Sequence, residues 1–461
     1  MIKFICSLCL LCLGFSVTAS DQVIGTTVEF SSPRGIKEQC IALTHMPGGI
    51  YTDQDRHIEK KYCSMDIYSN TGLCPKTWST SPGTMFYPLA GSKYKSIAQF
   101  ENSVCKNQKH IPIKSIAFKN TMNEQSTSGT FSTASLLYYH FSRYFNTQIQ
   151  VPVAVYRSID ENEHRHRVSQ RGLNNTHGNS MIHNAWKVML HIESSPSSYY
   201  PVNEVFTRDK KQIYGVLLRS TGKRYNAVVN GTRQSGWGEG QNRDFEETPA
   251  FWALRSQKPL VHAVTDGMNK ARNNHTMSKA MGHKLTKEQV VFWMQDLTEI
   301  TLMDYIFSQQ DRIGNIDYTK TWVSENSGML QRSKKHTFSG KKALQIKQTH
   351  LNDNDAGGRY SYANFSKKTG MLEKTHHYNV NTYLQLMKLH KDFSQQGKLY
   401  QYLDRTFGLS KKQRDMIVKN TKMAAEIIQS HCHSGQLIFD LEPEQFFLHG
   451  SVEPVNQSCE L

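Results

Sequence analysis

Beyond its first twenty residues the sequence lacks any apolar run long enough to span a bilayer. A membrane-spanning helix needs about 20 consecutive apolar residues, and no later stretch approaches this. The segment 4–17 is almost wholly apolar, follows Lys3 and leads into Val17-Thr18-Ala19, the small-residue pattern of a cleavage site. We therefore expect residues 1–19 to be a signal peptide. The remainder is expected to be a soluble exported protein: periplasmic, secreted or in a secretory-pathway lumen.

Cysteines are few, and three of the nine lie in the predicted signal peptide. Among the six that remain, no pair has the short C-x₂₋₄-C spacing of a zinc site, and an even number in an exported chain favours disulfides. Four lie in the first third of the chain and two near its end. We predict two bridges within the amino-terminal region and a third that joins the last two cysteines. The six are Cys40, Cys63, Cys74, Cys105, Cys432 and Cys459.

Acidic residues are outnumbered, 39 against 55 lysines and arginines, which gives a formal net charge of +16. Such a charge favours acidic partners, among them phosphorylated ligands, anionic lipids and glycans, and nucleic acid. The basic residues are nevertheless spread along the chain. Their densest group, 332–335 with 341–342, is typical of a solvated loop. The distribution therefore argues against a nucleic-acid partner.

Common phosphate, calcium and metal motifs are also missing. Residues 235–240 are rich in glycine but lack the GxxxxGK[ST] spacing of a P-loop. The acidic segment that begins at Asp353 has no glutamate near the twelfth position, which an EF-hand requires. The histidines at 164, 166, 177 and 183 are not spaced as helical metal ligands, and we interpret them as surface residues.

The most strongly patterned stretch is 286–318. Thr286 and Gln289 fit a capping box, with Leu285 and Val290 placed as a hydrophobic staple. Apolar residues then recur at three- and four-residue steps, which predicts one long amphipathic helix with its stripe on a core. The pattern ends at Gly314. The stripe consists of Val291, Met294, Leu297, Ile300, Met303 and Phe307.

A charged segment, residues 310–315, follows the predicted helix and is expected to form a turn. An acid directly after a rigid helix, here Asp311, is aimed as a catalytic carboxylate requires. The alternative is a solvated loop in which Asp311 pairs with Arg312 or caps the next turn. Both interpretations are open at this point.

The rest of the chain is β-rich in its first half and helical in its second. Residues 20–110 are rich in turn residues and predict a loop-rich, Cys-containing extension around the main body. Alternation and apolar spacing predict the following elements. They are strands at 113–119, 151–157 and 342–348, a hairpin at 212–219 and 224–229, and helices at 134–145, 249–256, 259–273 and in two or more pieces between 379 and 431.

Two acidic turns carry the candidate chemistry. The first offers Asp311 and Asn315, and the second offers Asp353 and Asp355. Carboxylates with a carboxamide suit Mg²⁺ or Mn²⁺, and Lys119 at the end of a predicted strand could contact phosphate oxygens. These are the minimum parts of phosphoryl transfer. Taken alone, the second turn fits a structural turn or a Ca²⁺ loop equally well.

Several segments resemble atypical kinases of the Golgi casein-kinase type and, more distantly, the HipA and phosphoinositide-kinase groups. Residues 305–312, YIFSQQDR, resemble their catalytic loop, and 349–354, THLNDN, their metal-binding loop. Residues 117–119, the helix around 139–143 and 151–153 are similar to the lysine strand, the αC-like helix and the next strand. The resemblance implies an α+β, kinase-like bilobal fold. Its parts would be a β-rich N-lobe at 111–245, a mainly helical C-lobe at 246–461 and a disulfide-braced extension at 20–110.

The resemblance also implies roles for these residues. Asp311 would orient or deprotonate the hydroxyl of a protein or glycan acceptor, and Lys119 would contact the phosphates of ATP. Asp353 or Asp355, with Asn315, would hold Mg²⁺ or Mn²⁺.

Departures from the family pattern leave alternatives open. The helix glutamate that should pair with the lysine falls at Ser135, and Glu124 is the nearest substitute. Ile313 replaces the histidine that is usual after Asp-Arg. The alternatives are a catalytically inactive, pseudokinase-like binding protein and a transferase of AMP on the same fold.

Overall fold

The computed structural model describes residues 23–108, 111–124, 127–231, 244–336, 342–356 and 364–460. The predicted signal peptide and the glycine-rich segment 235–240 lie outside these ranges. None of the helices within them combines the length and hydrophobicity that a bilayer crossing requires.

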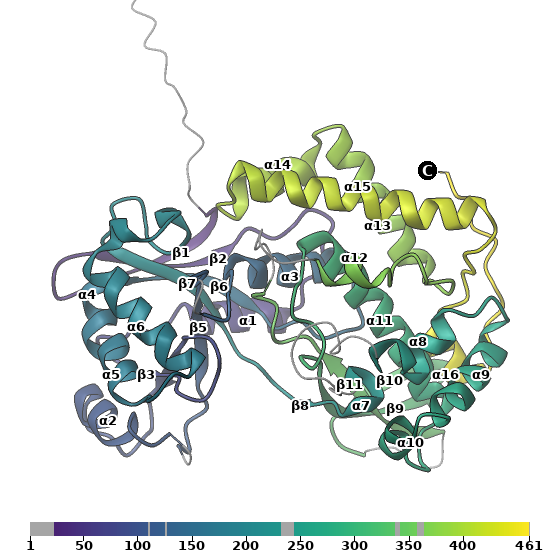
Figure 1. Cartoon of the computed structure of the whole chain (residues 1–461), viewed down its shortest axis with the longest axis horizontal. Coiled ribbons are helices and arrows are strands. Elements are labelled where there is room, and N and C mark those ends of the chain that lie inside the picture. The colour runs from purple at the N-terminus through teal and green to yellow at the C-terminus, as the bar shows by residue number, and fades with distance from the viewer. Residues whose placement is uncertain are drawn as a thin grey trace, which may run out of the picture.

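The amino-terminal part is built on a seven-stranded sheet with the order β1-β2-β6-β7-β5-β4-β3 (Figure 1). Every neighbouring pair is antiparallel. Four strands come from residues that were predicted to form a loop-rich wrap, so that expectation was wrong. The reason is burial, because β3 is covered at all five positions although it lies at the edge of the sheet. The strands are β1 (Gly25–Ser31), β2 (Lys37–Leu43), β3 (Thr71–Pro75), β4 (Thr84–Pro88), β5 (Ile116–Asn120), β6 (Ala154–Asp160) and β7 (Gln212–Leu218).

Helices cover both faces of this sheet. Val155 and Leu217 pack with Trp186 on one face, and Ala154 and Val216 pack toward α3 on the other. This alternation is the period of two expected of a strand buried on both sides. The helices are α1 (Asp53–Tyr62), α2 (Ile97–Val104), α3 (Thr133–Tyr144), α4 (Glu161–His164), α5 (Gln170–Asn174) and α6 (Met181–Ser194).

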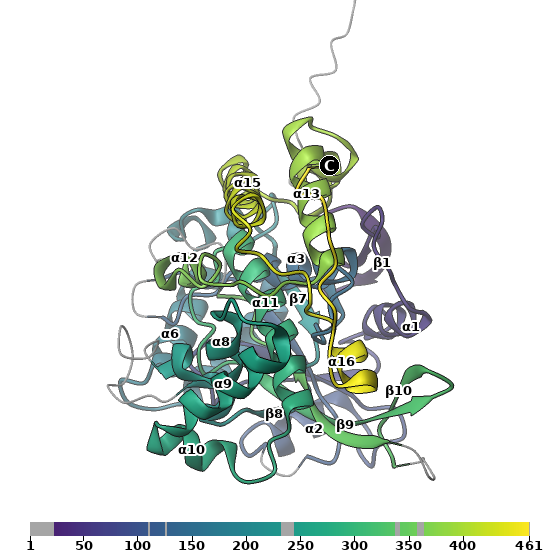
Figure 2. The ribbon, with the colours of Figure 1, turned by 90° about the vertical axis from the view of Figure 1, so that its right-hand side faces the viewer.

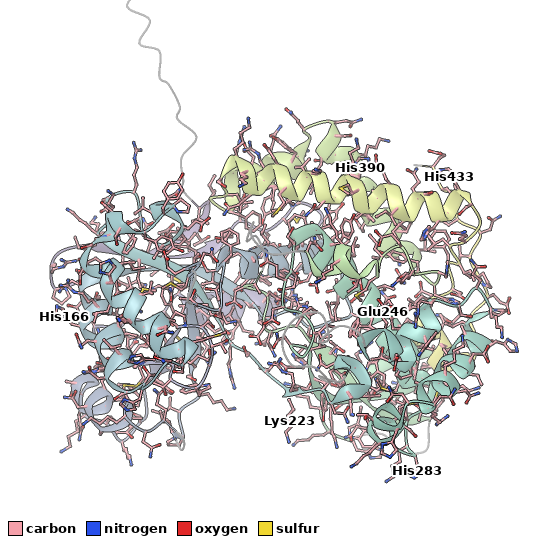
Figure 3. The ribbon with its side chains drawn as sticks, in the orientation of Figure 1. His166, Lys223, Glu246, His283, His390 and His433 are labelled. Carbon is pink, nitrogen blue, oxygen red and sulfur yellow. A yellow bond between two sulfur atoms is a disulfide. The ribbon has the colours of Figure 1, made fainter. Side chains whose placement is uncertain are left out.

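The histidines of this region divide into buried and exposed ones. His166 is exposed at the outer edge of the amino-terminal part (Figure 3). His164 is fully buried, contrary to the prediction of a surface residue. Its ring nitrogens contact Thr84 Oγ1 at 2.7 Å and the Glu193 carboxylate. It is therefore a satisfied core histidine.

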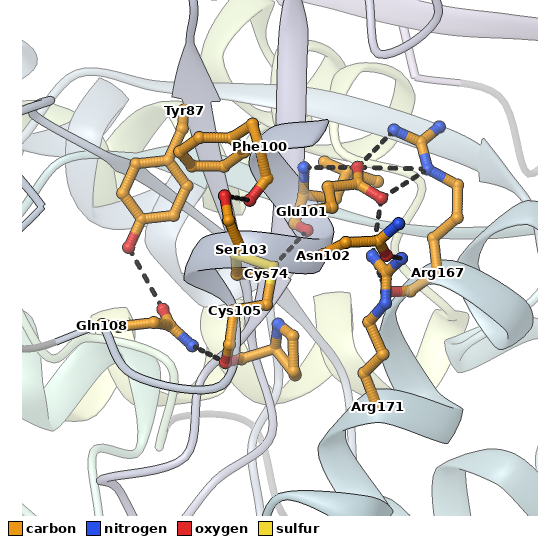
Figure 4. The surroundings of a disulfide bond; sticks show 12 residues. Cys74, Tyr87, Phe100, Glu101, Asn102, Ser103, Cys105, Gln108, Arg167 and Arg171 are labelled. Carbon is orange, nitrogen blue, oxygen red and sulfur yellow. Dashed lines mark hydrogen bonds and ion pairs between the residues drawn. A yellow bond between two sulfur atoms is a disulfide. The ribbon is translucent and has the colours of Figure 1, made fainter. Parts of the chain in front are cut away.

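Three disulfides join Cys40 to Cys63, Cys74 to Cys105 and Cys432 to Cys459. This confirms the predicted division, with two bridges in the amino-terminal region and one in the tail. Around the second bridge, Glu101 of α2 accepts hydrogen bonds from Arg167 and Arg171 (Figure 4). The bridge and these ion pairs together hold α2 against β3 and α5.

The carboxy-terminal part is mainly helical, and α15 runs along one side of it (Figures 1 and 2). A second sheet has the order β10-β9-β11, with β8 paired to β9. The predicted α+β fold, with a β-rich amino-terminal part and a helical carboxy-terminal part, is confirmed. The strands are β8 (Lys223–Arg224), β9 (Asp317–Asn326), β10 (Met329–Ser333) and β11 (Ala343–His350). The helices are α7 (Ala227–Asn230), α8 (Pro249–Leu254), α9 (Leu260–Arg272), α10 (His275–Met281), α11 (Lys287–Phe307), α12 (Phe365–Thr369), α13 (Val380–Ser394), α14 (Lys398–Thr406), α15 (Lys411–His433) and α16 (Pro443–His449).

The predicted hairpin at 212–219 and 224–229 does not form. Its first arm is β7, but the chain then crosses to the carboxy-terminal part, where β8 pairs with β9 (Figure 1). The remainder of the second arm is the short helix α7, because the Asn226 side chain caps the N–H of Val228.

Helix α11 is central to the carboxy-terminal part. Every residue from Gln289 to Phe307 is buried, so the predicted one-sided stripe was wrong. Helices α3, α8, α9, α15 and α16 and strand β11 surround it, and a helix enclosed in this way needs no solvent face. Thr286 caps the helix as expected, but the Gln289 side chain bonds Lys347 of β11 instead of completing the box. The helix ends at Phe307, where Ser308 turns left-handed with a φ of 57°.

We predict that Met303→Ala destabilises the chain by about 2–5 kcal/mol, because Met303 is fully buried and the substitution leaves a cavity. Lys287→Ala, at the exposed start of the same helix, should change the free energy of unfolding by less than about 0.5 kcal/mol. Urea unfolding followed by circular dichroism measures both. Equal effects of the two substitutions would contradict the enclosed position of α11.

Candidate active site

Lys119 of β5 lies at the centre of a buried charge cluster. Its Nζ is 2.7 Å from Asp355 Oδ1 and 3.2 Å from Asp353 Oδ1. Strand β5 holds the lysine from both sides, since it pairs with β4 and β7. The lysine side chain is only 10% exposed. The structure thus brings together the lysine and the second acidic turn.

The cluster shifts the ionisation of its members. Burial alone would lower the pKa of Lys119, but the carboxylates of Asp355 and Asp353 outweigh it and raise that pKa above its ordinary value. Burial alone would raise the pKa of Asp353, but Lys119 and Arg224 lower it to about 2. At neutral pH both groups are therefore charged.

The first acidic turn packs directly on the second. Gln309 Nε2 and Arg312 Nη1 both donate to the carbonyl oxygen of Asp353, each at 3.2 Å. Arg312 also donates to Asn354 Oδ1 at 2.9 Å. Asp311 lies between the two donors in sequence, so its backbone is fixed beside the turn that holds Lys119.

Arg312 is itself anchored below the site. The Arg312 guanidinium forms a bidentate pair with Asp304, with N–O distances of 2.8 and 2.9 Å. Tyr138 of α3 donates to the same carboxylate at 2.6 Å. All three side chains are buried, so α3, α11 and both acidic turns share one polar network.

Asp311 and Asn315 form a compact turn. The N–H of Asp311 donates to Gln309 Oε1, and its carbonyl accepts from Asn315 Nδ2 at 2.6 Å. Gly314 lies inside this turn with a φ of 79°, which glycine adopts without strain. Asp311 is partly exposed.

Arg224 is a member of the site that the sequence did not indicate. It contacts Asp317 Oδ1 at 2.9 Å and Asp353 Oδ2 at 3.1 Å, and it also donates to Asn315 Oδ1. Asn352 donates to the other oxygen of Asp317 at 2.7 Å. Arg224 was assigned to a hairpin arm, and no local pattern shows that β8 crosses to the second sheet.

Lys76, at the end of β3, was also missed. Its N–H bonds the carbonyl of Gly83, which closes the hairpin to β4. Burial, and then repulsion by Lys119, lower the pKa of Lys76. A second amino group therefore lies within electrostatic reach of the cluster.

Glu124 and Ser135 do not supply the expected helix acid. Among the described residues, the ion partners of Lys119 are Asp353 and Asp355, and Glu124 is not one of them. Glu124 precedes α3 and its carbonyl accepts from Thr127. Ser135 is buried with its Oγ unbonded to any described group. The pairing of Glu124 with Lys119 that we considered is not formed, because two aspartates already neutralise the lysine.

The donor set fits a divalent ion that arrives with a nucleotide. The described residues contain no group of three or more His, Cys, Asp or Glu side chains arranged as a complete metal cage. Mg²⁺ is commonly bound by one or two carboxylates together with phosphates and water. Asp353 and Asp355, which share one lysine, provide two such carboxylates.

Asp353→Asn should lower stability near neutral pH. The pKa of Asp353 is about 2 in the folded chain, below the ordinary value of about 3.9 in an unfolded chain. Its stabilisation is therefore present above pH ~4 and is lost as the pH falls toward ~2. Because the side chain is 38% exposed and solvent screens its ion pairs, we expect a loss of about 1 kcal/mol.

Urea unfolding near neutral pH and near pH ~2 tests this. The exposed Glu453→Gln is the control and should change little at either pH. A difference between Asp353→Asn and the unsubstituted chain that does not depend on pH would contradict the assignment.

No family model matches this chain. A tRNA(Phe) 7-((3-amino-3-carboxypropyl)-4-demethylwyosine(37)-N(4))-methyltransferase 2 from Thermococcus kodakarensis is 33% identical over 85 residues. The match covers 18% of this chain and 40% of that protein, less than half of the length of the curated relative.

Two crystal structures of the Golgi casein kinase match this chain at low similarity. The crystal structure of that kinase with Mn/ADP bound has a TM-score of 0.40 and 11% identity, and the alignment covers 83% of this chain and 77% of the other. A second crystal structure of the Golgi casein kinase has a TM-score of 0.41 and 10% identity, with 84% and 78% covered.

Proposed function

We propose that this chain transfers a phosphoryl group from ATP to a hydroxyl of a protein or glycan, with Mg²⁺ or Mn²⁺. The observation that carries the proposal is the shared bonding of the two acidic turns. The second turn neutralises Lys119, and the residues that flank Asp311 bond the same turn. Lysine, metal-type carboxylates and an acceptor-side carboxylate are the parts that phosphoryl transfer uses.

Each residue has a role in this proposal. Lys119 binds the phosphates, and Lys76 adds positive charge above them. Asp311 orients the acceptor hydroxyl and takes its proton. Asp353 and Asp355, with Asn315, would hold the metal ion, which neutralises charge that develops on the phosphates.

The connectivity supports these roles. The lysine strand β5 is followed by α3, β6 and β7, and the chain then crosses once to the part that holds both acidic turns. The second turn is tied back to the start of α3, because the N–H of Phe131 donates to the Asp355 carbonyl. A nucleotide bound between Lys119 and these turns would lie where the two parts meet.

The three disulfides support an exported location, since such bonds persist in oxidising compartments. An acceptor on an exported protein or a glycan is consistent with that location.

A specific observation also favours the inactive, pseudokinase-like alternative. Arg224 contacts both Asp353 and Asn315, so two proposed metal ligands are already engaged by a cation. AMP transfer is the other alternative, because the same residues could bind the nucleotide in a different pose. Intact-mass analysis of a modified acceptor separates phosphoryl from adenylyl transfer.

Lys119→Met should abolish binding of ATP with Mn²⁺. In a thermal-shift titration, nucleotide at 100 times its dissociation constant stabilises the unsubstituted chain by about 2.7 kcal/mol. The variant should show no shift, whereas Lys95→Met, at an exposed lysine, should behave as the unsubstituted chain. Circular dichroism is the control that checks whether both variants fold. An unchanged shift in Lys119→Met would rule out the proposed nucleotide site.

Asp311→Asn should separate chemistry from binding. We expect phosphorylation of an acceptor to slow by about 10²–10⁴, the usual contribution of a general base, while the thermal shift with ATP and Mn²⁺ is retained. The measurement is transfer of labelled phosphate to an array of exported proteins and glycans. A shift with ATP but no transfer by the unsubstituted chain to any acceptor or to itself would favour the inactive alternative.

A further inference from the structure

A basic cavity of about 740 Å³ lies apart from the candidate active site. Neither Lys119 nor the two aspartates that pair with it line this cavity. Basic side chains reach it from α1, from the segment before β5, from α3, from the segment after β7 and from the turn after β10. They are Lys61, Lys114, Arg143, Arg219 and Lys334.

The positive charge of the lining is largely uncompensated. Among the described residues that line the cavity, Asp55 is the one acid. It is already held by Arg143, with N–O distances of 2.8 and 3.1 Å. No ion pair within the described ranges involves the other four basic residues, which are Lys61, Lys114, Arg219 and Lys334.

His350 also lines this cavity and is affected by its positive charge. Burial, and then the charge of Lys334, lower the pKa of His350 to about 4, so the imidazole is neutral near pH ~7. Its ring nitrogens contact the hydroxyls of Thr221 and Thr319, both at 2.9 Å. It therefore adds no charge of its own, and the charge of the cavity comes from its lysine and arginine side chains.

The size of the cavity indicates the class of ligand. Small-molecule sites span about 300–1,000 Å³, and this cavity falls inside that range. Because the basic groups come from different walls, one anionic group could not satisfy them all. Phosphate and sulfate groups suit such a lining, since each offers several acceptor oxygens to ammonium and guanidinium donors.

We propose that this cavity binds a small polyanion that carries two or more phosphate or sulfate groups. The site is separate from the proposed nucleotide site and does not rest on the proposed function. Its wall nevertheless contacts the active-site scaffold, because the N–H of Gln150 donates to the Thr349 carbonyl and the N–H of Leu351 donates to Gln150.

The experiment is isothermal titration of the folded chain with inositol hexakisphosphate and with inositol hexasulfate at physiological ionic strength. Lys61→Glu/Lys114→Glu should weaken binding at least about tenfold. Both lysines are exposed and lack ion partners among the described residues, so this variant should fold. Lys279→Glu/Lys388→Glu changes the net charge equally at exposed sites on α10 and α13 and should weaken binding less than about twofold.

Binding of either probe in this pattern supports the proposal, and the preferred probe identifies the anionic group. Equal weakening by both double variants would overturn it, because the attraction would then be diffuse. Loss of binding in Lys119→Met, with binding retained in Lys61→Glu/Lys114→Glu, would overturn it as well, since the probe would then occupy the nucleotide site. The absence of binding by both probes, or binding of an acidic peptide in their place, would also overturn it.

Discussion

The arrangement of this protein depends on the neutralisation of one buried ammonium group. Lys119 lies within a sheet, and its charge is balanced by aspartates 234 and 236 residues later in the chain. An unpaired buried charge is strongly unfavourable, so the sheet and the second acidic turn must assemble together. The same contact brings the amino-terminal and carboxy-terminal parts of the chain into a fixed relation.

A second buried ion pair places the first acidic turn. Arg312 pairs with Asp304 on α11 and reaches the backbone of the Asp353 turn. Because α11 is enclosed by packed helices, the position of Asp304 is fixed. The ion pair with Asp304 then fixes Arg312, and with it the backbone of the adjacent Asp311. Function is therefore proposed where the long-range pairing of Lys119 meets the local Arg312–Asp304 pair, and the rest of the helical part supports both.

Local patterns in the sequence predicted much of this but not all of it. The helix from Thr286, the lysine strand and the disulfide division followed from capping, alternation and cysteine positions. Capping and spacing could not show that α11 is enclosed on every side, because this depends on helices from both earlier and later parts of the chain. For the same reason the sequence did not reveal Arg224, whose strand β8 pairs with β9 in another sheet instead of turning back on β7. The sequence alone showed that Ser135 stands where a helix acid was expected. Only the structure shows that Asp353 and Asp355 pair with Lys119 in its place.

The central claim is that Lys119 and the two acidic turns enclose a metal–nucleotide complex. A crystal structure of the chain grown with Mn²⁺ and a non-hydrolysable ATP analogue tests it most directly. The account predicts an anomalous manganese peak beside Asp353 or Asp355, with phosphate oxygens in contact with Lys119. A nucleotide bound elsewhere, or an unchanged Lys119–Asp355 pair with no manganese beside it, would contradict the account.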